Sequence, residues 1–256
     1  MRLKTTKLIA TFYVILIMGL SFSEVYSQEV MNITKNDNTV LTIPTSEIQS
    51  ITFSNSSSSE NSSTVTDIDG NVYKTVKIDN QVWMAENLRT TKLNNGQPIP
   101  LVTENKGWIY RTTLGYCWYD NDEAANNNIY GALYNWYTIE NVCPIGWHVP
   151  SNSDWDILIK YVGITAGNKL KEVGTEHWQS PNSGATNISG FTAVGSGYRN
   201  AASGIFDFKG GTSLWWTSSE KNATNALTKS MSTNSREVGG GMYSKSYGAC
   251  IRCLKD

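Results

Sequence analysis

The residues best able to do chemistry in this chain of 256 residues are its four cysteines. Cys117 and Cys143 lie far upstream of Cys250 and Cys253, which belong to the last segment. If that segment is a strand, Cys250 and Cys253 face opposite sides and should not bond each other. This disfavours a redox Cys-x-x-Cys motif, which also needs a helix start to lower the pKa of one thiol. Four cysteines permit three pairings, and cysteines so far apart in an exported chain are typical of a structural disulfide.

The histidines and carboxylates offer little further chemistry. His148 lies in a Gly-Trp-His-Val-Pro turn, where a structural imidazole is expected, and His177 stands alone in a loop. Asp67 and Asp69 resemble the start of a calcium loop that lacks its remaining ligands, and residues 120–123 read as a solvated acidic turn. No nucleophile has a recognisable base, and no phosphate loop or zinc spacing occurs. We therefore predict no catalytic residue, no metal and no cofactor.

Aromatic rings are the stronger candidates for function. The chain has nine tryptophans and thirteen tyrosines, and flat aromatic faces suit the apolar faces of sugar rings. Most of these rings, Trp136 and Trp147 among them, are expected in the core. Trp108, Tyr110 and Trp178 lie instead in polar, loop-like sequence, which predicts exposed rings that bind a ligand. Adjacent Trp215 and Trp216 point to opposite faces of a strand, so one of them, taken as Trp215, is a further candidate.

The N-terminus indicates export. Arg2, Lys4 and Lys7 precede an apolar run over residues 8–20, and small residues follow at 25–27. This is the layout of a signal peptide over residues 1–27, with an uncleaved anchor as the alternative. No later segment is long and apolar enough to span a membrane, and a formal net charge of -1 offers no basic surface for nucleic acid. We predict a secreted or surface-exposed protein, with the periplasm as the alternative compartment.

The rest of the chain divides into a small element, a linker and a main domain. Residues 28–53 read as a β element with a hairpin, at 31–34 and 39–43, and a third strand at 51–53. Residues 54–64 are rich in Ser and Asn, which predicts a flexible linker. The main domain covers residues 65–256 and is large enough to bury a core.

The main domain shows two helical patterns and many short strands. The first helix is expected over residues 130–140, and the second begins after Ser151 or Ser153 as its cap. The domain is expected to open with a hairpin, in which a turn at 69–71 leads through residues 72–78 and a second turn at 79–80 into residues 82–84. Further strands separated by glycine-rich turns are expected at residues 191–194, 204–208, 214–219 and 249–254. The pattern shows little βαβ repetition, so it predicts an α+β fold.

Six motifs of this domain follow one another in a characteristic order. They are DIDGNVY at 67–73, QVWMAENLR at 81–89, YGALYNW at 130–136, CPIGWHVP at 143–150, WWTS at 215–218 and RCLKD at 252–256. Together they resemble the Fibrobacter succinogenes major paralogous domain family, whose members are secreted or surface proteins. The resemblance implies a C-type-lectin-like fold, distantly similar to that of formylglycine-generating enzymes. It also implies a disulfide between Cys143 and Cys253, which leaves Cys117 for Cys250. The alternative for Cys117 and Cys250 is a pair of buried free thiols.

The resemblance brings no settled activity, so three functions stay open. The first is a non-catalytic binding domain for an unknown glycan or surface protein, carried by exposed aromatic rings. The second is an oxidase-like relative of the formylglycine-generating enzymes. The spacing of Cys250 and Cys253 differs from theirs, and a cysteine bonded to Cys143 cannot hold copper as a thiolate. The third is a purely structural cell-surface module. We favour the binding domain.

Overall fold

The computed structural model describes residues 29–34, 39–47 and 63–256 of the chain. These residues belong to two separate units. The first contains an antiparallel hairpin of β1 (Val30–Thr34) and β2 (Val40–Pro44), followed by the 3-10 turn η1 (Thr45–Glu47). The hairpin expected from the sequence is therefore confirmed. The signal peptide at 1–27, the third strand at 51–53 and linker residues 54–62 lie outside the described residues, so these assignments and the domain boundaries stay predictions.

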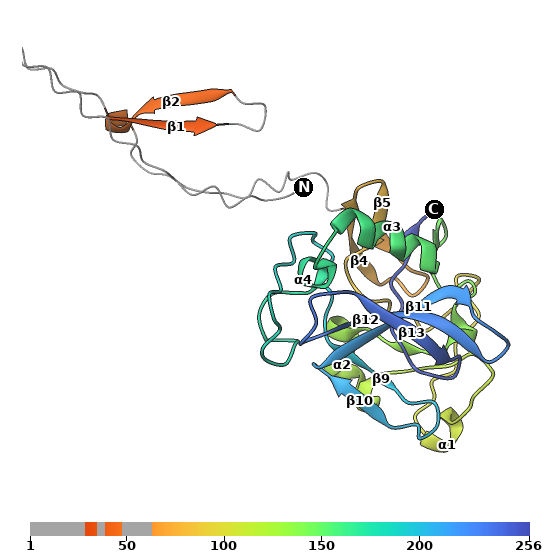
Figure 1. Cartoon of the computed structure of the whole chain (residues 1–256). Helices are drawn as coiled ribbons and strands as arrows, with labels where there is room; N and C mark the ends of the chain where they lie inside the picture. Colours follow the sequence, from red (N-terminus) through yellow and green to blue (C-terminus); the bar gives the residue numbers. More distant parts are fainter. Residues whose placement is uncertain (1–28, 35–38, 48–62) are drawn as a thin grey trace, which may run out of the picture. The chain divides into compact units, whose positions relative to one another are not determined.

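The second unit is built mainly from two five-stranded sheets (Figure 1). The first sheet has the order β3-β4-β5-β14-β8, and the second has the order β10-β9-β11-β12-β13. A small pair of strands, β6 (Tyr116–Cys117) and β7 (Leu133–Tyr134), stands apart from both. The bounds of the ten strands in the two sheets are β3 (Thr64–Thr66), β4 (Val72–Ile78), β5 (Gln81–Met84), β8 (Trp147–His148), β9 (Ser196–Arg199), β10 (Phe206–Lys209), β11 (Thr212–Glu220), β12 (Asn225–Ser232), β13 (Gly239–Ser244) and β14 (Leu254–Lys255).

The first sheet follows directly from local sequence. The first four side chains of β4, at residues 72–75, alternate between exposed and buried, as expected for a strand with one face on the core. The turn before β4 contains Gly70 at φ 86°, and the turn after it contains Asp79 at φ 55°. Both backbone conformations lie in the left-handed region, which glycine adopts freely and aspartate tolerates. The opening hairpins of the domain were therefore predictable.

Helices are short and few among the described residues. The longest is α3 (Asn152–Val162), which is capped by Ser151: its hydroxyl and the Asp154 side chain exchange hydrogen bonds with each other's backbone N–H groups. Ser151 is one of the two caps expected from the sequence, and the structure adds the reciprocal bonds of a capping box. The remaining helical segments are α1 (Asn105–Trp108), α2 (Glu123–Tyr130), α4 (Ala166–Leu170) and the 3-10 turns η2 (Tyr119–Asn121) and η3 (Trp136–Thr138).

The expected helix over residues 130–140 is wrong. Helix α2 ends at Tyr130, because Gly131 adopts φ 72° and turns the chain. The following backbone then pairs with distant segments: the Ala132 N–H donates to the Leu88 carbonyl, and Tyr134 exchanges hydrogen bonds with Ala249. Apolar spacing suggested a helix, but tertiary pairing places this segment in strand β7 and the turn η3.

The strand predictions are correct in part. Residues 214–219 lie within β11, and residues 206–208 within β10. Residues 191–194 contain a single bridge, between Ala193 and Lys171, and no strand. In the C-terminal segment, only the last residues form a regular strand, β14.

The expected α+β, C-type-lectin-like class is also wrong. The described residues form fourteen strands in four sheets, and no helix among them exceeds the 11 residues of α3. The protein is a β-rich fold. The sequence was misleading because many of its strands have only two to four residues, too short to show an alternating pattern.

The C-terminal segment joins the sheets through single bridges. Gly248 pairs with Arg199 of β9, Ala249 with Tyr134 of β7, and Cys250 with Trp215 of β11. Leu254 then pairs with both Trp83 of β5 and His148 of β8. This one segment therefore ties together β strands from the whole unit, which is why it is almost entirely buried.

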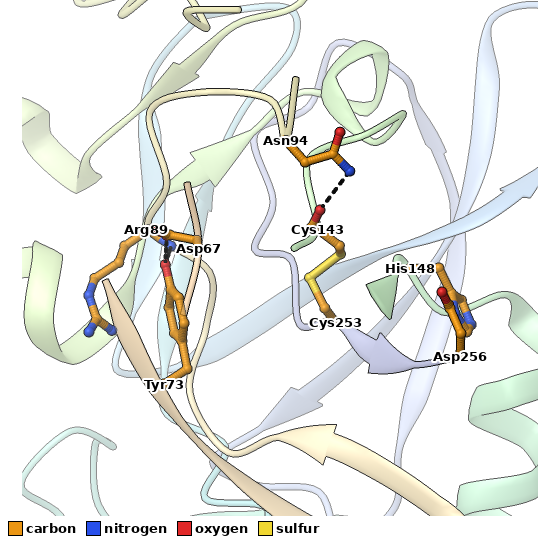
Figure 2. The surroundings of a disulfide bond; sticks show 8 residues. All are labelled: Asp67, Tyr73, Arg89, Asn94, Cys143, His148, Cys253 and Asp256. Atoms are coloured by element: carbon orange, nitrogen blue, oxygen red, sulfur yellow. Dashed lines mark hydrogen bonds and ion pairs between the residues drawn. A yellow bond between two sulfur atoms is a disulfide. The ribbon is translucent and has the colours of Figure 1, made fainter. Parts of the chain in front are cut away.

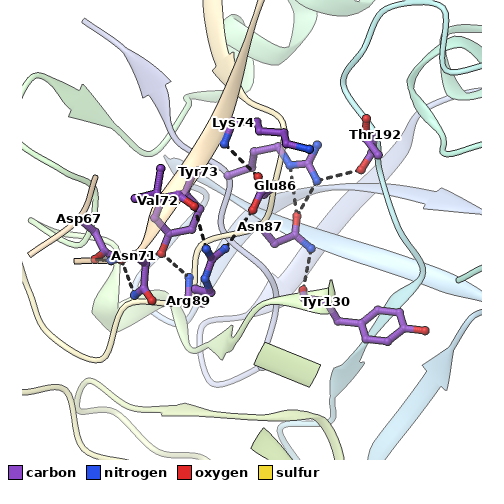
Figure 3. A network of polar contacts seen from close by, with 11 residues as sticks. Asp67, Asn71, Val72, Tyr73, Lys74, Glu86, Asn87, Arg89, Tyr130 and Thr192 are labelled. Carbon is purple, nitrogen blue, oxygen red and sulfur yellow. Dashed lines mark hydrogen bonds and ion pairs between the residues drawn. The ribbon is translucent and has the colours of Figure 1, made fainter. Parts of the chain in front are cut away.

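A buried polar network holds the centre of the unit (Figure 3). The Asn87 amide nitrogen donates to the Tyr130 carbonyl at 2.9 Å, and its oxygen accepts from Trp215 at 2.9 Å. The same oxygen accepts from Arg252 at 3.0 Å, and Arg252 also donates to the Thr192 carbonyl. Arg252 is only 1% exposed, and the oxygens that accept from it here are neutral. Removing Asn87 would leave this charge short of partners.

Candidate functional site

The predicted disulfide between Cys143 and Cys253 is present. The two sulfur atoms are 2.05 Å apart, and the two Cα atoms are separated by 5.9 Å. Cys143 precedes β8 and Cys253 precedes β14, and these two strands pair with each other. The bond therefore reinforces the junction between the middle and the end of the chain (Figure 2).

The second predicted disulfide is absent: Cys117 and Cys250 are both free and buried. Burial raises the pKa of Cys117 to about 12 and that of Cys250 to about 11. Both thiols belong to the same hydrophobic core cluster as Trp215. The alternative of two buried free thiols is therefore correct, because both cysteines serve as small apolar side chains in the core.

A hollow of about 570 Å³ lies beside the disulfide. We call it the disulfide-side cavity. It is lined by half-buried aromatic rings together with amide, hydroxyl, carboxylate and imidazole groups. Its rings are Trp136, Tyr137 and Trp147, and its polar groups include Asn94, Asn141 and His148.

A tight turn places Trp147 at this cavity. The Trp147 N–H donates to the Pro144 carbonyl at 2.9 Å, and Gly146 between them adopts φ 81°. A positive φ at this position of a turn is the conformation that glycine adopts without strain. The Asn94 amide donates to the Cys143 carbonyl at 3.0 Å and so fixes the neighbouring wall (Figure 2). The disulfide and these hydrogen bonds preorganise the cavity.

Trp136 is held from two sides. Its indole N–H donates to the Thr217 carbonyl at 3.0 Å, and the Lys245 ammonium lies 4.3 Å from the centre of the ring. Lys245 also forms an ion pair with Glu220 at 2.6 Å. A ring fixed in this way loses little side-chain entropy when a ligand binds.

His148 has carboxylate partners for both of its ring nitrogens. Nδ1 lies 2.6 Å from Asp256, and Nε2 lies 3.6 Å from Asp154, the residue of the α3 capping box. The imidazole therefore bridges the C-terminal residue and the start of α3. The structural role expected for His148 fits these contacts, and His148 is also one of the residues that line the cavity.

His177 has a partner that the sequence did not reveal. Its Nδ1 lies 2.8 Å from Glu172, and its ring packs edge-on against Tyr130 with 5.6 Å between centroids. The prediction that His177 stands alone is therefore wrong. A shallower hollow of about 360 Å³ lies at this loop.

Carboxylates of the suspected calcium-like turn are used by the turn itself. Asp67 accepts from the backbone N–H groups of Asp69 and Asn71, each at 2.9 Å. Burial alone would raise the pKa of Asp69, but hydrogen bonds from Lys92 and from residues 90–91 outweigh it and lower the pKa to about 2. In the part of the chain that the structure describes, no group of three or more His, Cys, Asp or Glu side chains is placed to hold a metal ion.

Three of the four predicted ligand-binding rings are core residues. Trp108, Trp178 and Trp215 are each at most 1% exposed, whereas Tyr110 is 65% exposed. The expected exposure of the three tryptophans is therefore wrong, which removes the basis for assigning them to a ligand. No observation tests binding by Tyr110.

The two polar loops that contain Trp108 and Trp178 each place their ring beside a buried cation. Arg199 lies 4.7 Å from the centre of the Trp108 ring, and Lys171 lies 5.7 Å from that of Trp178. Both cations are buried, and aromatic faces stabilise a desolvated cation. Arg199 is distant from Trp108 in the sequence, and Lys171 carries no recognisable signal. The sequence therefore could not show these pairs.

Trp215 and Trp216 do point to opposite faces of β11. Trp215 lies in one hydrophobic core cluster and Trp216 in the other. Both faces of the strand are covered, so both rings are buried. Conversely, Trp136 and Trp147 were assigned to the core, but both are half-buried and line the cavity. Their only sequence signal was a position next to turns.

Comparison with known proteins identifies one family. The model of the Fibrobacter succinogenes major domain matches residues 76–255, which is more than half of the chain. No curated protein and no solved structure matches this chain. In residues 29–34, 39–47 and 63–256, no helix combines the length and the apolar character needed to cross a bilayer.

Proposed function

This chain belongs to the Fibrobacter succinogenes major domain family, and we propose that it is a non-catalytic domain that binds a glycan in the disulfide-side cavity. The family and the Cys143–Cys253 disulfide indicate an extracellular or envelope protein. Such a protein meets polysaccharides and the glycans of other surface molecules.

One observation carries the proposal. The disulfide-side cavity presents the half-buried rings of Trp136, Tyr137 and Trp147 next to the amides of Asn94 and Asn141. Aromatic faces pack against the C–H groups of a sugar ring, while amides donate to and accept from its hydroxyl groups. Flat apolar faces beside polar side chains are what a sugar requires.

The oxidase-like alternative receives less support from the cysteines. Copper chemistry of that kind needs accessible thiolates. Cys253 is bonded to Cys143, and burial raises the pKa of Cys250 to about 11. A buried thiol with so high a pKa is protonated at neutral pH and is a poor metal ligand.

The test is binding of the mature protein to a glycan array, followed by calorimetry with the best ligands. Trp147→Ala should weaken binding by about 1 to 3 kcal/mol, which is roughly 5-fold to 150-fold in Kd. Trp147→Phe should retain part of the affinity, because a smaller ring still stacks. Tyr161→Ala is the matched control: Tyr161 is an aromatic residue on α3 that is 58% exposed and does not line the cavity.

Two outcomes would contradict the proposal. One is a Trp147→Ala variant that folds normally and binds the same glycans with unchanged affinity. The other is the absence of glycan binding by the wild-type protein across the array.

A further inference from the structure

Glu140 gives the wall of the disulfide-side cavity a charge of its own. This residue lines the cavity and is exposed. Within residues 29–34, 39–47 and 63–256, Glu140 forms no ion pair. In the same ranges, no Lys or Arg lines the cavity. The wall of the cavity therefore contains a carboxylate that no cation of the described chain neutralises.

Backbone hydrogen bonds hold the segment that carries Glu140. Before it, the Ile139 N–H donates to the Trp136 carbonyl at 3.1 Å and closes the turn η3. After it, the Asn141 carbonyl accepts from the Asn94 N–H at 2.7 Å. Asn141 has φ 57°, a conformation that asparagine tolerates. The backbone is therefore fixed on both sides of Glu140, and its side chain is the part left to adjust to a ligand.

The side of the cavity formed by His148 carries negative charge as well. Figure 2 shows Asp256 beside the His148 ring, and the carboxylates of Asp256 and Asp154 lie 2.6 and 3.6 Å from its two nitrogens. A protonated imidazole balances one of these two charges, and a neutral imidazole balances neither. This group of three side chains is therefore negative in both protonation states of His148.

Two lysines contact residues of the cavity, but they do not reverse the sign of its charge. Lys245 is paired with Glu220 at 2.6 Å. Lys255 lies opposite Trp147 in the pairing of β14 with β8 and supplies one positive charge. The three carboxylates described above outnumber Lys255 and a protonated His148 together. A cleft with an excess of one sign of charge attracts ligands of the opposite sign.

The aromatic rings of the cavity also favour a cation. An ammonium group over an aromatic face is attracted by the quadrupole of the ring, and the Lys245 ammonium already lies in this way 4.3 Å from the centre of Trp136. In the part of the chain that the structure describes, Tyr137 and Trp147 pack against no other aromatic ring and no cation. Both rings are half-buried, so each has surface to offer to a ligand.

We propose that the glycan bound in the disulfide-side cavity carries protonated amino groups, as a polymer of glucosamine does, and that Glu140 selects it over neutral and acidic glycans. The inference rests on the proposed function and specifies its ligand. A sugar ring packs on the aromatic faces while its ammonium group forms an ion pair with Glu140. A neutral sugar gains no such pair, and the carboxylate of a uronic acid is repelled by Glu140.

The test is calorimetry of the mature protein at pH 5.5 with β-1,4-linked tetrasaccharides of glucosamine, N-acetylglucosamine and glucose, and with tetragalacturonate. We expect the wild type to bind the glucosamine tetrasaccharide about 3-fold to 10-fold more tightly than the two neutral ones, and tetragalacturonate least. Added salt should reduce this preference, because it screens exposed charges.

Substitutions of Glu140 test its role directly. Glu140→Gln should bring the affinities for the glucosamine tetrasaccharide and the neutral ones within about 2-fold of each other. Glu140→Lys should favour tetragalacturonate over the glucosamine tetrasaccharide. Glu140 is exposed, so neither variant should change thermal stability. Glu104→Gln is the matched control, because Glu104 is exposed and does not line the cavity, and this change removes the same charge.

The inference is overturned if a neutral tetrasaccharide binds the wild type as tightly as the glucosamine one, if Glu140→Gln keeps the preference, or if Glu104→Gln loses it. A lysine tetrapeptide that binds as tightly as the glucosamine tetrasaccharide would also overturn it, because the cavity would then recognise charge without the sugar. In the first three cases the proposed function still holds if Trp147→Ala weakens binding of the glycan that does bind. If Trp147→Ala leaves that affinity unchanged, the proposed function fails.

Discussion

Reduction of the Cys143–Cys253 disulfide should remove a large part of the stability of the main unit. The bonded residues are 110 positions apart, and the chain-entropy model gives about 4.8 kcal/mol at 25 °C for closing a loop of that length. Most small domains are stable by about 5 to 15 kcal/mol in total. The cross-link therefore supplies a third or more of the margin.

The assay is urea unfolding followed by tryptophan fluorescence, on the oxidised and the reduced wild-type protein. Both cysteines are at most 2% exposed, so the bond must be reduced in urea and the protein refolded with the reductant present. Comparing two redox forms of one sequence keeps every core atom and isolates the cross-link. We expect the free energy of unfolding to fall by about 3 to 5 kcal/mol and the urea m-value to rise, because the unfolded chain becomes less compact.

Cys143→Ala/Cys253→Ala is the control, because its stability should not respond to the reductant. A wild-type loss below about 1 kcal/mol, or an equal loss in the double variant, would refute the reasoning. The first result would show that native strain or residual structure in the unfolded state cancels the entropic gain. The second would show that the reductant acts on something other than the cross-link.

Three further predictions follow from the buried groups and turns. The free thiols of Cys117 and Cys250 should not react with a thiol reagent in the native protein at pH 8, but both should react in urea. The free energy of unfolding should fall above about pH 9, because the thiols ionise there in the unfolded chain but not in the native protein, where their pKa values are about 12 and 11. Asp69→Asn should lose less stability than the wild type as the pH falls. In the wild type the pKa of the Asp69 carboxyl is lowered from 3.8 to about 2, so its carboxylate stabilises the fold above pH 3.8 and this contribution disappears as the pH falls from 3.8 through 2. Urea midpoints between pH 2 and pH 5 measure the difference. Gly131→Ala should lower the free energy of unfolding by more than about 2 kcal/mol, since its Cβ would lie 2.7 Å from a side chain and 2.8 Å from a carbonyl oxygen. Gly174→Ala is the control, because Gly174 also has a positive φ but faces open space, and it should lose about 1 kcal/mol. Equal losses of stability in thermal denaturation would contradict the steric argument.

Local features of the fold were visible in the sequence. Ser151 and Asp154 indicate the start of α3, because an N-cap residue and the first turn that it caps lie within four consecutive residues. The turn containing Gly70 and the alternating pattern at the start of β4 indicate the first hairpins, because these features are also local in the sequence. In each case the partners of the backbone groups lie a few positions apart, so no distant segment can change the result.

Tertiary structure decided which rings and thiols are accessible. The polar loops around Trp108 and Trp178 predicted surface rings, yet both rings are buried and pack against buried cations. Cys117 and Cys250 looked like a second pair, but they fill the core as free thiols.

The same holds for the helix expected at 130–140 and for the disulfide-side cavity. Pairing of Tyr134 with Ala249 overrides a helical pattern, because the hydrogen bonds gained across the fold outweigh a weak local preference. The disulfide-side cavity joins residues from segments far apart in the chain. The sequence alone determined the residue types and the turns. Only the packing of distant segments determined which side chains face solvent together, because burial depends on contacts that sequence spacing does not encode.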